Sequence, residues 1–169
     1  MKLRFATVAL LAGTVALAAC KKEPPESLPP EPAPTTSAPT PTGPTGPVLG
    51  TQEHFENAVN GQNVIYFDLD RYNVDSADMA ALQTQAQYLA QYPNITITVE
   101  GHADERGTRE YNLALGERRA NSAKNYLVSL GVAANRIRTV SYGKERPAAL
   151  GSNEAAWAQN RRAVSVVVN

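Results

Sequence analysis

The sequence predicts an α/β domain with α+β character, in which a small mixed β-sheet has helices packed on one face. Two observations predict this class. Segments with the pattern of strands alternate with segments with the pattern of helices from residue 63 to residue 168. The two longer helical segments each carry one apolar face, so two helices on one side of a sheet is the economical packing. The expected element order is β-α-β-α-β-β, with a short helix before the last strand.

The predicted domain begins with two short elements. Residues 52–60 are expected to form a short helix that ends at Gly61. Residues 63–68, NVIYFD, are rich in β-branched and aromatic residues, which favour strands. They are predicted to be the first strand.

The next helix is predicted from its cap and its apolar face. Asp75 or Ser76 can accept hydrogen bonds from the free amides of a first helical turn, and residues 92–94 (YPN) end the helix. The predicted buried face recurs at helical spacing and consists of Met79, Leu82, Ala86 and Leu89.

The second strand and the longest helix follow. Residues 95–102 alternate between apolar and polar, which is typical of a half-buried strand. Residues 108–130 are expected to form a helix that ends at Gly131. The predicted apolar stripe of this helix consists of Leu113, Gly116, Ala120, Ala123, Leu127 and Leu130.

The last part of the chain is predicted to contain two strands around a short helix. Residues 137–142 and residues 162–168 have the β-rich composition of strands. Ser152 is expected to cap a helix over residues 154–159. The predicted domain therefore covers residues 51–169.

The amino terminus has the pattern of an export signal. Lys2 and Arg4 precede a run of apolar residues over 5–17, which is shorter than the ~20 residues of a membrane-spanning helix. Residues 1–19 are therefore predicted to be a signal peptide. The sequence LAAC over residues 17–20 resembles the bacterial lipobox, which implies cleavage before Cys20 and covalent lipid on that residue. The alternative is an ordinary signal peptide followed by a chance cysteine.

Residues 20–50 are predicted to form a lipid-bearing, disordered tether. Ten of the 12 prolines lie between Pro24 and Pro47, and no apolar period accompanies them. At up to ~3.1 Å per residue, thirty such residues reach about 90 Å. The favoured interpretation is a spacer, and the alternative is a docking site for a proline-binding domain.

The composition excludes several classes of function. The 16 Lys and Arg residues balance the 16 Asp and Glu residues, so the chain lacks the basic surface of a nucleic-acid-binding protein. With one cysteine, the chain forms no internal disulfide and no cysteine-based zinc site. His102, Asp104 and Glu105 give too few ligands for a metal site, and no metal or other cofactor is expected. His102 is instead expected to donate hydrogen bonds near the site.

The candidate site lies in residues 101–119, GHADERGTREYNLALGERR. Asp104 follows the predicted second strand. Asn112 and Arg119 are seven residues apart, so they lie on one face of the following helix. A carboxylate and a guanidinium facing one space would suit a zwitterion, because Asp104 can take an ammonium and Arg119 a carboxylate. The alternatives are a solvated or capping Asp104 and a surface ion pair of Arg119 with Glu117 or another carboxylate.

Four segments carry a resemblance to a known family. They are GHADERGT, EYNLALGERRANSAK, VSYGKERPA and NRRAV, in this order. They resemble the peptidoglycan-associated lipoproteins of the Tol–Pal system, within the wider OmpA C-terminal-like domain family, over about residues 62–168. Arg109 departs from the proline that close relatives often have there. The lipobox agrees with the resemblance, and the tether does not match.

The resemblance implies a function and a set of site residues. It implies non-covalent binding of peptidoglycan through the diaminopimelate of the stem peptide, by Asp104, Asn112 and Arg119. The Phe-Asp ending of the first strand, Phe67 and Asp68, is implied to line the same site. It further implies an outer-membrane lipoprotein with its domain in the periplasm, a role in envelope integrity and cell division, and TolB and other Tol proteins as partners.

Two rival functions are kept beside this one. An OmpA-like anchor of another envelope complex would bind the wall equally well. A peptidoglycan hydrolase would need a nucleophile, a metal or a separated pair of carboxyls, and the sequence offers none of these. Ser141 and Lys144 form an S-x-x-K pattern without its partner motifs. Arg161 and Arg162 are expected to be solvated charges, and the alternative is a partner-binding patch. The chain is therefore predicted not to be an enzyme.

Overall fold

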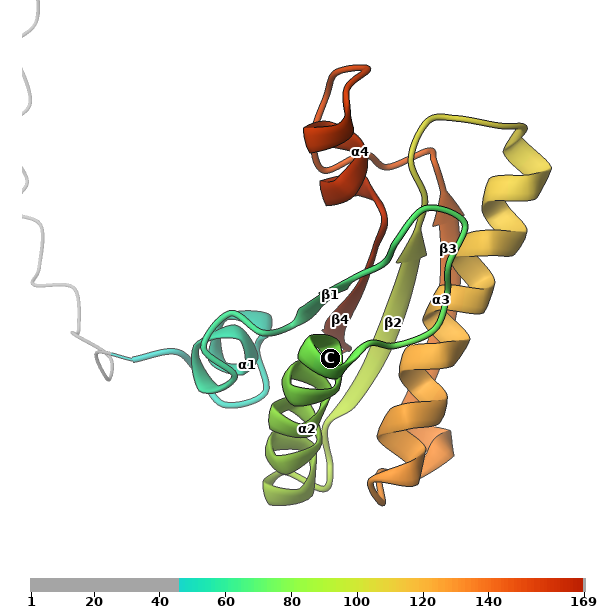
Figure 1. Ribbon diagram of the computed structural model, residues 1–169. Coiled ribbons are helices and arrows are strands. Elements are labelled where there is room, and N and C mark those ends of the chain that lie inside the picture. Colours follow the sequence, from blue (N-terminus) through green and yellow to red (C-terminus); the bar gives the residue numbers. More distant parts are fainter. Residues whose placement is uncertain (1–45, 169) are drawn as a thin grey trace, which may run out of the picture. The chain divides into compact units, whose positions relative to one another are not determined.

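The computed structural model describes residues 46–168, so the predictions for the signal peptide, Cys20 and most of the tether lie outside the described residues. Figure 1 shows the arrangement of the elements. Their order is α1 (Gln52–Ala58), β1 (Val64–Tyr66), α2 (Ser76–Gln91), β2 (Thr96–His102), α3 (Arg109–Ser129), η1 (Ala134–Arg136), β3 (Ile137–Gly143), α4 (Glu154–Asn160) and β4 (Arg162–Val168). The predicted fold class and element order are confirmed.

The four strands form one mixed sheet in the order β1-β4-β2-β3. The last strand lies between β1 and β2 and runs antiparallel to both, whereas β2 and β3 are parallel. Tyr66 pairs with Arg162, and Gly101 pairs with Ala163. The first residues of β4 therefore lie beside the last residues of β1 and β2, at the end of the sheet where β3 also ends.

The core lies between the sheet and the helices α2 and α3. Ile97 and Val99 of β2 are fully buried, as the alternating pattern predicts. The helices contribute further buried side chains to the same cluster, namely Leu82, Ala86, Leu89, Ala120, Ala123 and Leu127. Met79 and Leu130, which the pattern assigns to this face, are 37% and 40% exposed, because each lies at the end of its apolar stripe. Among residues 46–168, no helix is both long and apolar enough to cross a membrane.

Two glycines allow α3 to approach β2 closely. A Cβ atom on Gly101 would overlap the carbonyl oxygen of Gly116, and a Cβ on Gly116 would lie 2.8 Å from the carbonyl oxygen of Gly101. Only a residue without a side chain fits at either position. This contact sets the distance between α3 and the end of β2, where the candidate site lies.

The caps and boundaries differ slightly from the expectations. Asp75 caps α2 by accepting from the amide of Asp78 at 2.8 Å. Asn153 rather than Ser152 caps α4, because the Asn153 side chain accepts from the amide of Ala156 at 3.0 Å. Strand β1 is shorter than predicted, since the chain turns at Asp68, whose carbonyl accepts from the amide of Arg71.

Candidate functional site

Asp104 lies just beyond the end of β2. The amide of Ala103 donates to the carbonyl of Gly143 at 2.8 Å, which keeps the chain beside the end of β3. Ser141 and Lys144 further fix this edge of the sheet. Ser141 Oγ donates to the carbonyl of Leu113, and Lys144 Nζ donates to the carbonyls of Glu105 and Gly107. The serine and the lysine of the S-x-x-K pattern therefore both donate their side-chain hydrogen bonds to backbone carbonyls.

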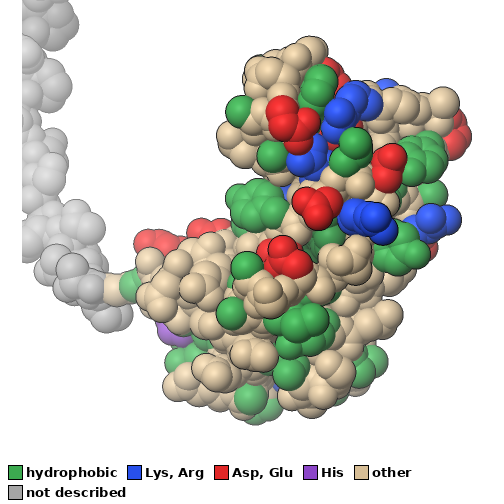
Figure 2. Space-filling model, in the orientation of Figure 1, with side chains coloured by type: hydrophobic (Ala, Val, Ile, Leu, Met, Phe, Trp, Pro, Cys, Tyr) green, Lys and Arg blue, Asp and Glu red, His purple; other side chains and the backbone are tan. Residues whose placement is uncertain are grey.

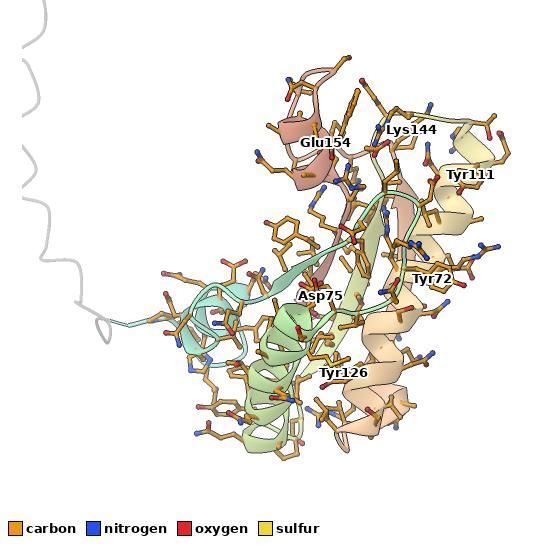
Figure 3. All side chains as sticks on the ribbon, in the orientation of Figure 1. Tyr72, Asp75, Tyr111, Tyr126, Lys144 and Glu154 are labelled. Carbon is orange, nitrogen blue, oxygen red and sulfur yellow. The ribbon has the colours of Figure 1, made fainter. Side chains whose placement is uncertain are left out.

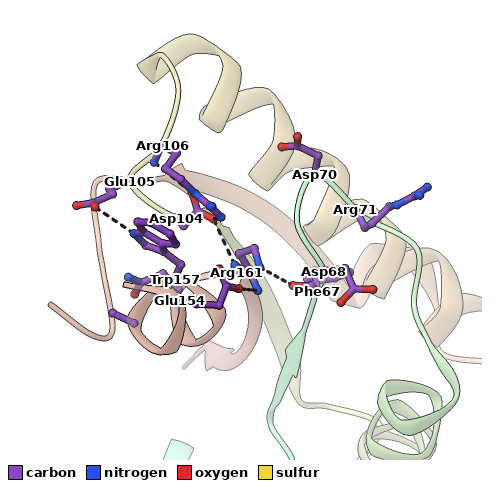
Figure 4. Close-up of polar contacts among 12 residues, drawn as sticks. Phe67, Asp68, Asp70, Arg71, Asp104, Glu105, Arg106, Glu154, Trp157 and Arg161 are labelled. Atoms are coloured by element: carbon purple, nitrogen blue, oxygen red, sulfur yellow. Dashed lines mark hydrogen bonds and ion pairs between the residues drawn. The ribbon is translucent and has the colours of Figure 1, made fainter. Parts of the chain in front are cut away.

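The carboxylate of Asp104 is buried and contacts two arginines (Figure 4). Arg106 donates from Nε to Oδ1 at 3.1 Å and from a terminal nitrogen to Oδ2 at 2.6 Å. Arg161 places a terminal nitrogen 3.5 Å from the same Oδ2. Burial by itself raises the pKa of Asp104, but the hydrogen bonds and charge of Arg106, aided by Arg161, outweigh it and leave the pKa below its ordinary value. Asp104 is therefore ionised at neutral pH.

Arg119 is fully buried and holds three backbone carbonyls. It donates to Arg71 at 2.8 Å, to His102 at 2.8 Å and to Asp68 at 3.1 Å. The alternative of a surface ion pair with Glu117 is therefore wrong. Burial lowers the pKa of Arg119 to about 10, while the charge of Asp104 opposes this shift, so the guanidinium stays protonated at neutral pH.

Three of the predicted site residues lie together. Asp104, Asn112 and Arg119 line one pocket of about 290 Å³, which we call the Asp104 pocket. Asn112 is buried and donates from its side-chain amide to the carbonyl of Arg106 at 2.8 Å. Figure 2 shows acidic and basic side chains gathered on the upper part of this face of the molecule. The structure thus brings a carboxylate and a guanidinium to one space, while their role in binding stays a prediction.

The other two predicted residues adjoin the Asp104 pocket through Arg119. Phe67 and Asp68 line a neighbouring pocket of about 410 Å³, and their contact with a ligand stays a prediction. Phe67 is 5% exposed and belongs to the core, with its ring 5.2 Å from the guanidinium carbon of Arg119. Phe67 is held in the core because its amide donates a hydrogen bond to the carbonyl of Arg161, directly before β4. The side chain of Asp68 is exposed, and its carbonyl is the part that Arg119 contacts.

The Asp104 pocket also contains residues that the sequence interpretation missed. Asp70 and Tyr111 line it, and the Tyr111 hydroxyl donates to Asp70 at 3.3 Å. Figure 3 shows that Tyr111 and Lys144 come from different elements at the same end of the molecule. Asp70 lies on a loop and has a φ of 54°. Loops have no periodic sequence pattern, so the position of the Asp70 side chain could not be predicted from the sequence. Arg106 could have been found, because it follows Asp104 by two residues in a polar loop.

Two expectations about charged groups near the site are corrected. Arg161 is 7% exposed rather than solvated, since its guanidinium donates to the carbonyl of Phe67 at 2.9 Å and to Glu154 at 2.8 Å. The ring of His102 packs 5.6 Å from that of Tyr142, and its nitrogens make no hydrogen bond among residues 46–168, with a carboxylate oxygen of Glu100 3.6 Å from Nε2. Burial, followed by the charges of nearby arginines, lowers the pKa of His102 to about 4. His102 contributes its carbonyl, not its ring, to the site.

Among the described residues, no group of three His, Cys, Asp or Glu side chains is placed to hold a metal ion. The Asp104 pocket contains one charged group of each sign. Asp104 supplies a carboxylate, and Arg119 supplies a guanidinium that uses three of its five N–H groups on carbonyls.

Comparison with known proteins assigns the chain to a family. Residues 66–161 match the model of the OmpA family. The peptidoglycan-associated lipoprotein of Rhizobium meliloti (strain 1021) is 56% identical over 118 residues, which are 70% of this chain and 66% of that protein. The lipoprotein of the same name from Brucella melitensis is 52% identical over 118 residues, 70% of this chain and 69% of that protein. Both of these relatives are named for their association with peptidoglycan, and neither name is that of an enzyme.

Solved structures agree with these relatives. The crystal structure of the peptidoglycan-associated lipoprotein from Burkholderia pseudomallei superposes with a TM-score of 0.64 at 48% identity, covering 67% of this chain and 96% of that one. The C-terminal domain of Helicobacter pylori MotB has a TM-score of 0.57 at 22% identity, covers 62% of this chain and 83% of that one, and shows the fold alone. The chain therefore belongs to the OmpA family and, within it, to the family of peptidoglycan-associated lipoproteins.

Proposed function

We propose that the protein is an outer-membrane lipoprotein whose periplasmic domain binds peptidoglycan non-covalently through the diaminopimelate of the stem peptide. It would tether the outer membrane to the cell wall as part of the Tol–Pal system, in envelope integrity and cell division. Lipid on Cys20 would anchor the chain, and residues 20–50 would join the anchor to the domain. The protein makes and breaks no covalent bonds in this role.

The single observation that carries the proposal is the shared pocket of Asp104 and Arg119. The side chain of diaminopimelate ends in an ammonium and a carboxylate on one carbon. Asp104, ionised at neutral pH, would accept the ammonium. Arg119 is charged and has two N–H groups beyond the three that hold carbonyls, and these would receive the carboxylate. Asn112 lies at the wall of the same pocket and would orient the ligand.

Reversible binding fits this arrangement. A single small pocket gives modest affinity, and many tethered copies along one wall raise the effective concentration at each new contact. The names of the relatives support a wall ligand, since they are peptidoglycan-associated lipoproteins. Phe67 and Asp68, in the neighbouring pocket, would then contact the ligand only where it extends past the Asp104 pocket.

A wall-binding assay with two kinds of peptidoglycan tests the proposal. Walls that contain diaminopimelate should retain the protein, and walls with lysine at that position should retain it about tenfold less, because lysine lacks the terminal carboxylate that Arg119 would bind. Asp104→Asn should weaken retention by about thirtyfold or more through loss of the buried charge pair. Equal retention on both walls would reject the assignment of Arg119.

The matched control is Glu110→Gln, which removes one acidic charge from the exposed first turn of α3. It should bind like the parent protein. Steady release of soluble muropeptides from the same walls would instead favour the hydrolase. Capture of TolB by the domain, and competition between TolB and wall, would separate the Tol–Pal role from that of an anchor in another envelope complex.

A further inference from the structure

Two arginines share the Oδ2 atom of Asp104, and they differ in how they are held. The side chain of Arg161 is 8% exposed and is fixed by the carbonyl of Phe67 and the carboxylate of Glu154. The side chain of Arg106 is 35% exposed and contacts Asp104 through two parallel hydrogen bonds. Arg161 is thus part of the interior, whereas the partly exposed guanidinium of Arg106 can move into solvent, provided that another cation takes its place beside the buried carboxylate of Asp104.

Arg106 also has a second contact that does not depend on Asp104. Its guanidinium lies 4.0 Å from the centroid of the Trp157 ring, and the indole nitrogen of Trp157 donates to Glu105 at 3.0 Å (Figure 4). A flat guanidinium on an aromatic face can shift along that face at small energetic cost. The indole therefore offers Arg106 a place to remain when its hydrogen bonds to Asp104 are broken.

The Arg106 side chain lies directly against the carboxylate of Asp104. The Asp104 side chain is only 6% exposed, and Arg106 engages both of its carboxylate oxygens. Arg106 lines the Asp104 pocket together with Arg119. A ligand cation that bonds to Asp104 from this pocket would therefore compete with the Arg106 guanidinium for the same two oxygens.

We infer that Arg106 is an internal competitor for Asp104, which a ligand displaces only by bringing a cation of its own. The exchange replaces one positive group by another, so Asp104 keeps its charge balance throughout. A neutral or anionic group cannot make this exchange, because it would leave the buried carboxylate with Arg161 alone. Arg106 thereby selects ligands that carry an ammonium. This inference rests on the proposed function, since it assumes that the ligand ammonium binds Asp104.

The opposite role for Arg106 predicts the opposite result. If Arg106 contacted the carboxylate of the ligand, its removal would weaken binding. If it competes with the ligand, its removal strengthens binding, because a larger fraction of the protein then has Asp104 free. The sign of the change in affinity separates the two roles.

The test is calorimetric titration of the full chain, purified in detergent, with a soluble diaminopimelate-containing muropeptide. Arg106→Gln should bind about three- to tenfold more tightly than the parent, and Arg106→Lys should lie between them, since lysine keeps a charge but loses the paired hydrogen bonds. Arg109→Gln is the matched control, because Arg109 is 61% exposed and pairs with Glu145 rather than Asp104. It should bind like the parent.

A second ligand distinguishes competition from a merely structural effect. The same muropeptide with the side-chain ammonium of diaminopimelate acetylated should bind weakly, and Arg106→Gln should bring it no gain. Weaker binding of the muropeptide to Arg106→Gln, or an equal gain with the acetylated ligand, would overturn the inference. Absence of binding to the parent protein would instead reject the proposed function itself.

Discussion

The guanidinium of Arg119 donates a hydrogen bond of 2.8 Å to the carbonyl of His102, which joins the middle of α3 to the last residue of β2. The same side chain holds the carbonyls of Asp68 and Arg71 in the loop between β1 and α2. One buried arginine thus connects three segments that are distant in the sequence. Arg119, which is proposed to bind the ligand carboxylate, therefore also holds together the segments that surround the Asp104 pocket.

Arg119→Ala should therefore lose stability as well as wall binding. Removal of the side chain leaves three carbonyls without a partner, and we expect the free energy of unfolding to fall by about 3 kcal/mol or more. Urea unfolding followed by circular dichroism measures this. Arg118→Ala is the control, because Arg118 is exposed on the same helix and should cost little. An Arg119→Ala protein as stable as the Arg118→Ala protein would contradict the structural role.

Gly101→Ala should destabilise the domain by separating α3 from β2. The added methyl group would overlap the carbonyl oxygen of Gly116, and overpacking of this kind typically costs about 1–3 kcal/mol. Thermal unfolding would detect the change, and wall binding should fall with it because α3 carries Arg119. Gly46→Ala serves as control, since a Cβ there meets no atom within 4 Å. Equal melting temperatures for the two variants would rule out the close contact.

His102 should make stability depend on pH between 6.5 and about 4. Its pKa falls from 6.5 to about 4 on folding, chiefly through burial, so the unfolded chain takes up a proton in this range while the folded protein does not. The free energy of unfolding therefore decreases as the pH falls from 6.5 to about 4, by about 3 kcal/mol from this residue.

Urea unfolding at pH 7 and at pH 4.5 would measure this dependence. His102→Phe keeps an aromatic ring beside Tyr142 and should remove most of the dependence. His54→Gln, which removes the other histidine, should retain it. The prediction fails if His102→Phe loses as much stability on acidification as the parent.

Cys20→Ser should release the protein from the membrane. Without the sulfur no lipid can be attached, and a chain held by the domain alone has no acyl groups to bury. Fractionation of cells should then find the protein in the soluble fraction, with the domain folded by circular dichroism. Ser27→Ala, a few residues along the tether, should leave the protein in the membrane pellet. A Cys20→Ser protein in the membrane pellet would argue against the lipid anchor.

The order and type of the elements could be predicted from the sequence because their causes are local. The alternation of apolar residues in β2, the stripe of α3, the Asp75 cap and the position of Asp104 after a strand all follow from neighbouring residues. Asn112 and Arg119 could be placed on one face of α3 by helical spacing alone. The sequence by itself therefore determined the fold class and the central residues of the candidate site.

Only the tertiary structure decided which groups these residues contact. Arg161 reaches Asp104 because β4 lies between β1 and β2 in the sheet. The pairing of strands that are so distant in the chain cannot be predicted from local periodicity. The same pairing holds Phe67 in the core, and the packing of α3 on the sheet places Arg119 beside carbonyls up to 51 residues away in the sequence. Burial and long-range hydrogen bonding fix the partners of a charged side chain, and both exist only once the sheet has assembled.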